Sequence, residues 1–342
     1  MSDHEPTLPP HRLSVVVPMF NERDNAAEMV DRVCGALAGY AHPWELVLVD
    51  DGSSDGTPGE LRAARARHGD HVRVLQLQRN YGQTAALQAG FDAARGDLAV
   101  TLDGDLQNDP RDIPIMVAEL FARDLDLLVG WRRRRRDDVL VRKVPSWLAN
   151  RLIRRLTGVS VHDYGCALKV FRATVFRRLQ LYGEMHRFIA AWAATVTRPD
   201  RIGEMEVRHH ARTHGRSKYG LERTFKVMLD LVAVFFFMRY RTKPVHFFGA
   251  IGFLVGGLGT AALVYLAGVK FLLGEDIGGR PLLLVAVVLV LAALQFVTTG
   301  VAMELMARTY FESGQATSYL LRQDPEPEKA TWAGRPAGRM EA

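Results

Sequence analysis

The chain has 342 residues, with 44 Lys and Arg against 38 Asp and Glu, which gives a formal net charge of +6. This length allows one large domain with its own hydrophobic core and further elements beside it. Cys34 and Cys166 are the only cysteines, so a disulfide framework is excluded and a reducing compartment fits them at least as well as an oxidising one. The first residues (MSDHEPTLPPHR) lack the apolar stretch of a cleavable signal peptide, so we expect the N-terminal part to stay in the cytosol.

Short apolar runs that each end in a polar turn predict strands, and helical periodicity predicts helices between them. The strands are expected at residues 13–17, 46–49, 72–77, 98–102 and 125–129. Helical spacing is found, for example, at residues 26–37 and 84–94. Alternating strands and helices imply an α/β fold with a mostly parallel sheet covered on both faces, whose ligand crevice lies at the carboxyl ends of the strands.

Three of these strands are followed by turns that contain acidic residues. The turns are residues 18–22 (PMFNE), 50–57 (DDGSSDGT) and 103–107 (DGDLQ). Because the carboxyl ends of parallel strands share one edge of the sheet, the turns together predict a binding site. Asp103 and Asp105, with a glycine between them, can converge on one divalent cation that bridges phosphate oxygens. The turn at residues 50–57 can also be read as a glycine-rich strand-to-helix turn with Ser54 or Asp55 as the N-cap, which leaves Asp51 without a capping role.

Two apolar stretches towards the C-terminal end predict a membrane hairpin. Neither residues 247–269 nor residues 282–303 include a charged side chain, and each stretch is long enough to cross a bilayer. The connector is too short to be a domain, so both flanks are expected on one side of the membrane. The basic residues on that side assign it to the cytoplasm: Arg239, Arg241, Lys243, Arg308 and Arg322. Gly252 and Gly256, four residues apart, predict a close contact between the two helices.

The segments around the hairpin differ in composition. Residues 221–240 place apolar side chains at helical spacing among charged ones, which predicts a helix lying in the membrane interface. The tail from residue 323 is rich in Pro, Glu, Lys and Gly and is expected to be disordered. The expected organisation is a disordered N-terminus (1–12), an α/β domain (13–220), an amphipathic juxtamembrane helix (221–243), two transmembrane helices (244–308, with spans at about 246–272 and 281–304) and a flexible cytoplasmic tail (309–342).

Together, the motifs resemble family 2 glycosyltransferases with the GT-A fold. The motifs are residues 15–22 (VVVPMFNE), 49–57 (VDDGSSDGT), 79–83 (RNYGQ) and 102–107 (LDGDLQ). Residues 162–169 (HDYGCALK), residues 212–218 (RTHGRSK) and the terminal hairpin resemble the polyprenyl-phosphate glycosyltransferase branch. That branch includes dolichyl-phosphate mannose synthase and bacterial enzymes that load undecaprenyl phosphate with glucose or a modified arabinose. The resemblance covers roughly residues 13–308 and does not specify the sugar.

The resemblance implies a site on the donor side. Residues that would line the nucleotide pocket are Pro18, Phe20, Glu22 and Asp51, with Phe20 standing where relatives often have tyrosine. The metal, Mg²⁺ or Mn²⁺, would be held against the sugar diphosphate by Asp103, Asp105 and Gln107, with Gly104 between the two carboxylates. Asp103 would also touch the ribose or the sugar, and Asp105 is the metal ligand that the motif indicates most directly.

The resemblance also implies a phosphate site on the acceptor side. Arg132, together with Arg142 and Ser146 four residues apart, would bind the lipid phosphate. Arg212 and Lys218 would complete a cationic pocket for phosphates, in which Lys218 serves the nucleotide sugar and Arg212 the acceptor. The remaining arginines of the run at 132–136 fit a solvated or lipid-facing basic patch. The implied catalytic residues are Asp103, Asp105, Asp163 and Arg212, of which Asp163 has the least defined role.

The implied reaction is an inverting, single-displacement transfer in which a lipid phosphate oxygen attacks the anomeric carbon. A phosphate monoester with a second pKa of about 6 is largely dianionic at neutral pH, so no general base has to remove a proton. In agreement, residues 183–186 (GEMH) stand where relatives that glycosylate hydroxyl groups carry a Glu-Asp pair. Glu184 is then an ordinary polar residue, although a role as a base stays open.

The expected protein is a metal-dependent enzyme of the cytoplasmic (inner) membrane, multi-pass, with its catalytic domain in the cytoplasm. It would transfer a sugar from a nucleotide-diphospho-sugar, with UDP favoured, to undecaprenyl phosphate for cell-envelope glycan or lipopolysaccharide modification. A GDP-mannose-dependent polyprenyl-phosphate mannose synthase is the alternative. A polysaccharide synthase is disfavoured because a Gln-x-x-Arg-Trp motif and further spans are missing, and a dinucleotide-dependent oxidoreductase because no Gly-x-Gly-x-x-Gly follows the first strand. Membrane lipid is an expected partner and nucleic acid is not, and a homo-oligomer is compatible with the resemblance.

Overall fold

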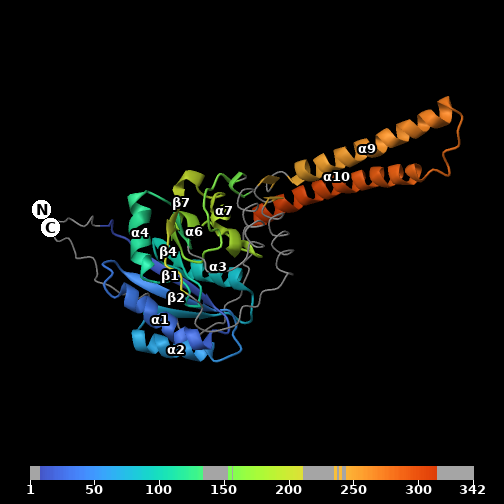
Figure 1. Cartoon of the computed structure of the whole chain (residues 1–342). Helices are drawn as coiled ribbons and strands as arrows, with labels where there is room; N and C mark the ends of the chain where they lie inside the picture. The colour runs from blue at the N-terminus through green and yellow to red at the C-terminus, as the bar shows by residue number, and fades with distance from the viewer. Residues whose placement is uncertain are drawn as a thin grey trace. The chain divides into compact units, whose positions relative to one another are not determined.

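The computed structural model describes residues 8–133, 153–155, 157–210, 235–236, 239–240 and 244–313 (Figure 1). The chain divides into two compact units, Met1–Phe225 with Thr317–Ala342, and Lys226–Ala316. The first unit contains a sheet between layers of helices, and the second contains two long helices.

The sheet of the first unit has seven strands in the order β3-β2-β1-β4-β6-β5-β7. The strands are β1 (Leu13–Met19), β2 (Trp44–Asp50), β3 (Val72–Gln76), β4 (Leu98–Thr101), β5 (Leu127–Trp131), β6 (Lys169–Arg172) and β7 (Ile202–Glu206). All neighbours pair in parallel except β6, which is antiparallel to both β4 and β5. The carboxyl ends of β1, β2 and β4 therefore lie along one edge of the sheet.

Helices cover both faces of the sheet. The helical elements are α1 (Arg23–Leu37), α2 (Thr57–His68), α3 (Gln83–Ala93), α4 (Asp112–Ala122), α6 (Ala173–Phe176), α7 (Ile189–Ala193) and the 3₁₀ turns η1 (Met185–Phe188) and η2 (Pro199–Arg201). Alternate β1 residues such as Val15 and Val17 join one core cluster with side chains of α1, α2 and α4. On the other face, a Cβ at Gly90 of α3 would lie 2.2 Å from Cγ1 of Val16, so only glycine lets α3 pack this closely.

The α/β fold predicted from the sequence is confirmed, and each expected strand is present. Two strands were not predicted, β6 and β7. β6 (KVFR) has only two apolar residues between cationic ones, and β7 (IGEME) has a glycine and two glutamates, so neither shows the continuous apolar run of a buried parallel strand.

The second unit contains α9 (Pro244–Leu272) and α10 (Pro281–Ser313), which pack against each other. By length and composition, residues Pro244–Leu272 and Pro281–Met306 are long and apolar enough to cross a membrane. The close contact expected near Gly252 and Gly256 is present: a Cβ at Gly256 would lie 2.9 Å from Cβ of Ala293, and one at Gly252 would lie 3.1 Å from the Ala293 carbonyl oxygen. The expected interfacial helix at 221–243 lies outside the described residues apart from residues 235–236 and 239–240, which are helical.

Candidate active site

The turns after β1 and β2 are joined by hydrogen bonds. Asn21, which has a left-handed backbone with φ of 54°, donates its N–H to Oγ of Ser53 at 2.9 Å. Its Oδ1 accepts the N–H of Ser54, also at 2.9 Å. The N–H of Glu22 donates to Oγ1 of Thr57 at 2.9 Å. Phe20 is exposed beside this junction, so its ring is available to a ligand at the edge of the sheet.

Asp51 connects the β2 turn to the segment that precedes α3. The residue is 2% exposed, and its two carboxylate oxygens accept the N–H groups of Tyr81 at 2.8 Å and Gly82 at 2.9 Å. Burial raises the pKa of Asp51, while these two hydrogen bonds act in the opposite direction. The sequence assigned Asp51 to the nucleotide pocket and found no capping role for it. In the structure the carboxylate holds the backbone next to that edge of the sheet.

Gly52 lets the turn after β2 lie close to the segment before α3. Its φ is 67°, and a Cβ at this position would lie 2.3 Å from the carbonyl carbon of Arg79 and 2.7 Å from the nitrogen of Asn80. Both of these atoms belong to backbone, which cannot swing away like a side chain. Glycine is therefore required both for the conformation and for the close approach.

The turn after β4 holds the two aspartates of the predicted metal site. Oδ1 of Asp103 accepts a hydrogen bond from Nε2 of Gln83 at 2.8 Å, and Oδ1 of Asp105 accepts the N–H of Gln107 at 3.2 Å. Leu106, which lies between Asp105 and Gln107, has a φ of 62°, a conformation unusual for leucine that makes the turn sharp. Gln83 is a contact that the sequence did not predict, although it stands in the RNYGQ motif.

The donor atoms of this turn fit a hard divalent cation. No group of three or more His, Cys, Asp or Glu side chains that could hold a metal is found among the residues the structure describes. Two carboxylates and an amide are instead the oxygen ligands that Mg²⁺ or Mn²⁺ takes when a diphosphate and water complete its coordination. The residues present therefore fit a metal that is bound together with a nucleotide.

Arg132 and Asp163 form a bidentate ion pair at the end of β5. Nε of Arg132 lies 2.7 Å from Oδ2 of Asp163, and Nη2 lies 2.9 Å from Oδ1. Their side chains are 12% and 14% exposed. Burial disfavours the guanidinium charge, but the hydrogen bonds to Asp163 outweigh it and raise the pKa of Arg132. The sequence placed these residues separately, Arg132 at the lipid phosphate and Asp163 near the reacting centre, whereas the structure brings them together.

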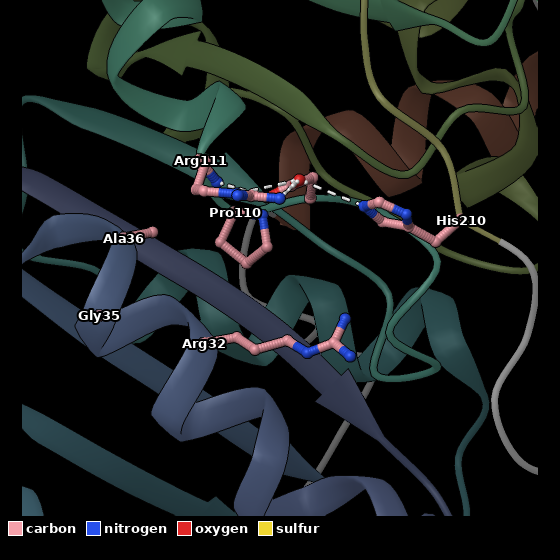
Figure 2. Close-up of a pocket in the computed structure, with 7 residues that line it drawn as sticks. Arg32, Gly35, Ala36, Pro110, Arg111 and His210 are labelled. Atoms are coloured by element: carbon pink, nitrogen blue, oxygen red, sulfur yellow. Dashed lines mark hydrogen bonds and ion pairs between the residues drawn. The ribbon is translucent and has the colours of Figure 1, made fainter.

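The segment after β7 lies against the turn after β4 (residues 103–107), which is called the metal-site turn below because it carries the predicted metal ligands. The N–H of His210 donates to the carbonyl of Gln107 at 2.8 Å, and Asn108 forms an antiparallel bridge with His209. Asp109, whose side chain is 4% exposed, binds Nη2 of Arg111 at 2.7 Å and the His210 ring at 3.2 Å, as the dashed lines in Figure 2 show. The sequence did not predict this role of Asp109, because its partner is 101 residues away.

The carboxylate of Asp109 also lines a cavity of about 500 Å³ on the α1 side of this turn. The remaining lining residues are Arg32, Gly35, Ala36, Pro110, Arg111 and His210 (Figure 2). Its arginines already pair with carboxylates, Arg32 with Glu28 and Arg111 with Asp109.

Several residues of the predicted site fall outside the described part of the chain. These are Arg142, Ser146, Arg212 and Lys218. Pro18 lies buried in β1, and Gly104 packs against it, since a Cβ there would lie 3.2 Å from the Pro18 carbonyl oxygen. Glu184 pairs with Arg187 at 3.1 Å, as an ordinary surface carboxylate does.

Comparison with known proteins identifies the family. The profile described as "Glycosyl transferase family 2" matches residues 14–180. Dodecaprenyl-phosphate galacturonate synthase of Rhizobium johnstonii is 56% identical over 311 residues, which are 91% of this chain and 92% of that protein. The chain belongs to glycosyl transferase family 2, in its polyprenyl-phosphate branch.

A second relative and a solved structure agree with this assignment of the glycosyltransferase. Undecaprenyl-phosphate 4-deoxy-4-formamido-L-arabinose transferase of Edwardsiella ictaluri is 37% identical over 325 residues, covering 93% of this chain and 97% of that protein. Among solved structures, glucosyl-3-phosphoglycerate synthase from Mycobacterium tuberculosis aligns with a TM-score of 0.52 at 20% identity, over 67% of this chain and 80% of that chain. This structural likeness confirms the GT-A fold.

Proposed function

We propose that this membrane glycosyltransferase transfers a sugar, with inversion, from a nucleotide-diphospho-sugar to a polyprenyl phosphate such as undecaprenyl phosphate. The observation that supports it most is the meeting of three acidic turns, after β1, β2 and β4, at one edge of the sheet. The hairpin of α9 and α10 in the same chain gives the enzyme access to a lipid acceptor.

The donor we propose is a UDP-linked uronic acid, galacturonic acid first. The support is the 56% identity to a protein named dodecaprenyl-phosphate galacturonate synthase, which is well above the 37% to the aminoarabinose transferase. A GDP-mannose donor is the second candidate to be tested. The product would serve modification of the cell envelope, including lipopolysaccharide.

The nucleotide would lie over the turns after β1 and β2, with Phe20 and Glu22 on one side and Asp51 beneath. Asp103, Asp105 and Gln107 would hold Mg²⁺ or Mn²⁺ with the diphosphate. The bound cation would neutralise the charge that develops on the departing nucleotide diphosphate. Gln83 would orient the Asp103 carboxylate through the hydrogen bond at 2.8 Å.

The acceptor phosphate would lie on the side of Arg132, with Arg142, Ser146 and Arg212 completing its site. Asp163 would act through Arg132, by fixing the direction of its guanidinium.

The membrane placement is part of the proposal. The catalytic unit would lie on the cytoplasmic side of the inner membrane, with both helices spanning and an interfacial helix before them. The division into the segments 1–12, 13–220, 221–243, 244–308 and 309–342 stays a prediction, as does a homo-oligomer.

The test uses the purified full-length protein in detergent with undecaprenyl phosphate and Mn²⁺ or Mg²⁺. UDP-galacturonic acid, UDP-galactose, UDP-glucose and GDP-mannose are offered separately, and glycosylated lipid is detected by mass. The proposal expects product from UDP-galacturonic acid in clear excess over UDP-galactose, which differs only at C6. Product from GDP-mannose alone would contradict the UDP-linked donor and support GDP-mannose. The absence of lipid product with every donor would contradict a polyprenyl phosphate acceptor.

A further inference from the structure

Lys169 is a buried cation that the reaction outlined above does not use. It is the first residue of β6, between β4 and β5 in the sheet, and the residue is 3% exposed. The register of β6 places it beside Thr101 of β4, two residues before Asp103, and beside Val129 of β5, three residues before Arg132. Lys169 therefore lies between the strand that leads to the metal-site turn and the strand that leads to the ion pair.

Among the described residues, the ammonium of Lys169 binds a backbone carbonyl. Its Nζ donates a hydrogen bond to the carbonyl of Cys166. Burial lowers the pKa of Lys169, whereas the Cys166 thiol and the carboxylates of Asp163 and Asp103 act in the opposite direction. A lysine at such a position is costly to desolvate unless its surroundings compensate it. This cost indicates that the side chain serves a purpose in the fold or in the reaction.

Further contacts hold the same segment. Oγ1 of Thr101 donates to the carbonyl of Ala167 at 2.6 Å, and Nδ2 of Asn108 lies 3.9 Å from Sγ of Cys166. Cys166 is fully buried, and its N–H lies 3.5 Å from the carbonyl of Asp163. The segment from Asp163 to Leu168 is thus fixed to the β4 strand and to the metal-site turn by polar contacts.

We infer that Lys169 is a positioning residue for transfer: through the Cys166 carbonyl it fixes the segment that carries Asp163, and through Asp163 it aims Arg132 at the metal-site turn. The inference rests on the proposed function. Lys169 itself touches neither substrate nor metal. Its loss therefore affects turnover and the acceptor side, and leaves nucleotide binding nearly unchanged.

The first test compares wild type with Lys169→Met and Lys169→Arg. Lys169→Met keeps the length of the side chain but removes the donor, so kcat falls by about tenfold or more while the Kd for UDP with Mn²⁺ changes by less than about threefold. Lys169→Arg restores the donor and recovers kcat to within about threefold of wild type. Unchanged kcat in Lys169→Met overturns the inference, and so does an equal loss of kcat and of UDP affinity without recovery in Lys169→Arg.

A second readout does not depend on turnover. In a Cys34→Ser background, Cys166 is the only thiol, and its burial makes its labelling by a maleimide slow. Lys169→Met raises the labelling rate by about tenfold or more if it releases the segment, whereas Arg73→Met, which removes a buried cation paired with Glu45, does not. Equal labelling in both variants contradicts the inference.

Thr101→Val keeps the test decisive if Lys169→Met fails to fold. It removes the bond to Ala167 without changing the shape of the side chain, and it is expected to lower kcat by about threefold with the same UDP affinity. Wild-type kcat in Thr101→Val overturns the inference. If wild type itself makes no glycosylated lipid from any donor, the proposed function fails instead, and the labelling experiment still reports on Lys169.

Discussion

The guanidinium of Arg132 donates hydrogen bonds to both carboxylate oxygens of Asp163, with heavy-atom distances of 2.7 and 2.9 Å, although the two residues are 31 positions apart in the sequence. Two N–H groups of Arg132 are therefore engaged by protein. An acceptor phosphate that uses Arg132 must either bind the remaining N–H groups, two on Nη1 and one on Nη2, or compete with Asp163. The pair is thus a structural contact, and under the proposed function it is also the described part of the acceptor site.

Breaking this pair should destabilise the catalytic unit. Asp163→Asn removes the charge opposite a mostly buried guanidinium, and we expect a loss of about 1.5–3 kcal/mol in the free energy of unfolding. A double-mutant cycle with Arg132→Gln, measured by denaturant unfolding, isolates the coupling. The exposed pair Arg198 and Asp200, with side chains 77% and 61% exposed, is the control and should contribute less than about 1 kcal/mol. Equal coupling in both pairs would contradict the importance of burial.

Gly52 should tolerate no side chain. In Gly52→Ala, the new Cβ would meet the backbone of Arg79 at 2.3 Å, so the turn after β2 must move away from Arg79 and Asn80. We expect the affinity for UDP with Mn²⁺ to fall by about tenfold, which is about 1.4 kcal/mol. Gly59→Ala in α2 is the matched control, because nothing lies within 4 Å of its Cβ, and it should bind UDP normally. Normal UDP binding by Gly52→Ala would show that this turn is not part of the nucleotide site.

Asp109 should make stability depend on pH. The hydrogen bonds from Arg111 hold the pKa of Asp109 well below its usual range, and the hydrogen bond from His210 lowers it further. A carboxyl with a lowered pKa in the folded state contributes stability above its unfolded pKa of about 3.9 and loses it as the pH falls towards the folded value. Asp109→Asn should therefore melt below wild type at pH 7, and the difference should shrink below about pH 4. A difference in melting temperature that stays constant from pH 7 to pH 3 would refute this.

The hairpin should depend on the glycine face of α9. A Cβ at Gly259 would lie 2.9 Å from Cβ of Leu289 and 3.0 Å from the carbonyl of Ala286, whereas nothing lies within 4 Å of one at Gly257. Gly259→Leu should cost about 1–3 kcal/mol through overpacking, measured as unfolding of helical structure by SDS. Gly257→Leu changes the same residue type two positions away and should be neutral. Equal effects would mean that helix propensity, not packing, determines the result.

The strands of the site were predictable because β1, β2 and β4 are buried on both faces and read as continuous apolar runs. The acidic turns were predictable because parallel strands bring their carboxyl ends together. β6 and β7 could not be predicted, since charged side chains such as Lys169 interrupt their apolar pattern. The bond between Gln83 and Asp103 and the pair of Arg132 and Asp163 also escaped prediction, because each joins residues far apart in the sequence and no local spacing encodes them.

The most direct test of the central claim compares wild type with Asp105→Asn in the transfer of sugar to undecaprenyl phosphate, across a titration of Mn²⁺. Asp70→Asn, which changes an exposed carboxylate in the turn before β3, is the matched control. We predict that wild type and Asp70→Asn form glycosylated lipid only when Mn²⁺ or Mg²⁺ is present, and that Asp105→Asn, still folded, loses at least about a hundredfold in kcat/KM. Full activity of Asp105→Asn, or transfer by wild type that EDTA does not change, would contradict a metal-assisted transfer at the turn after β4.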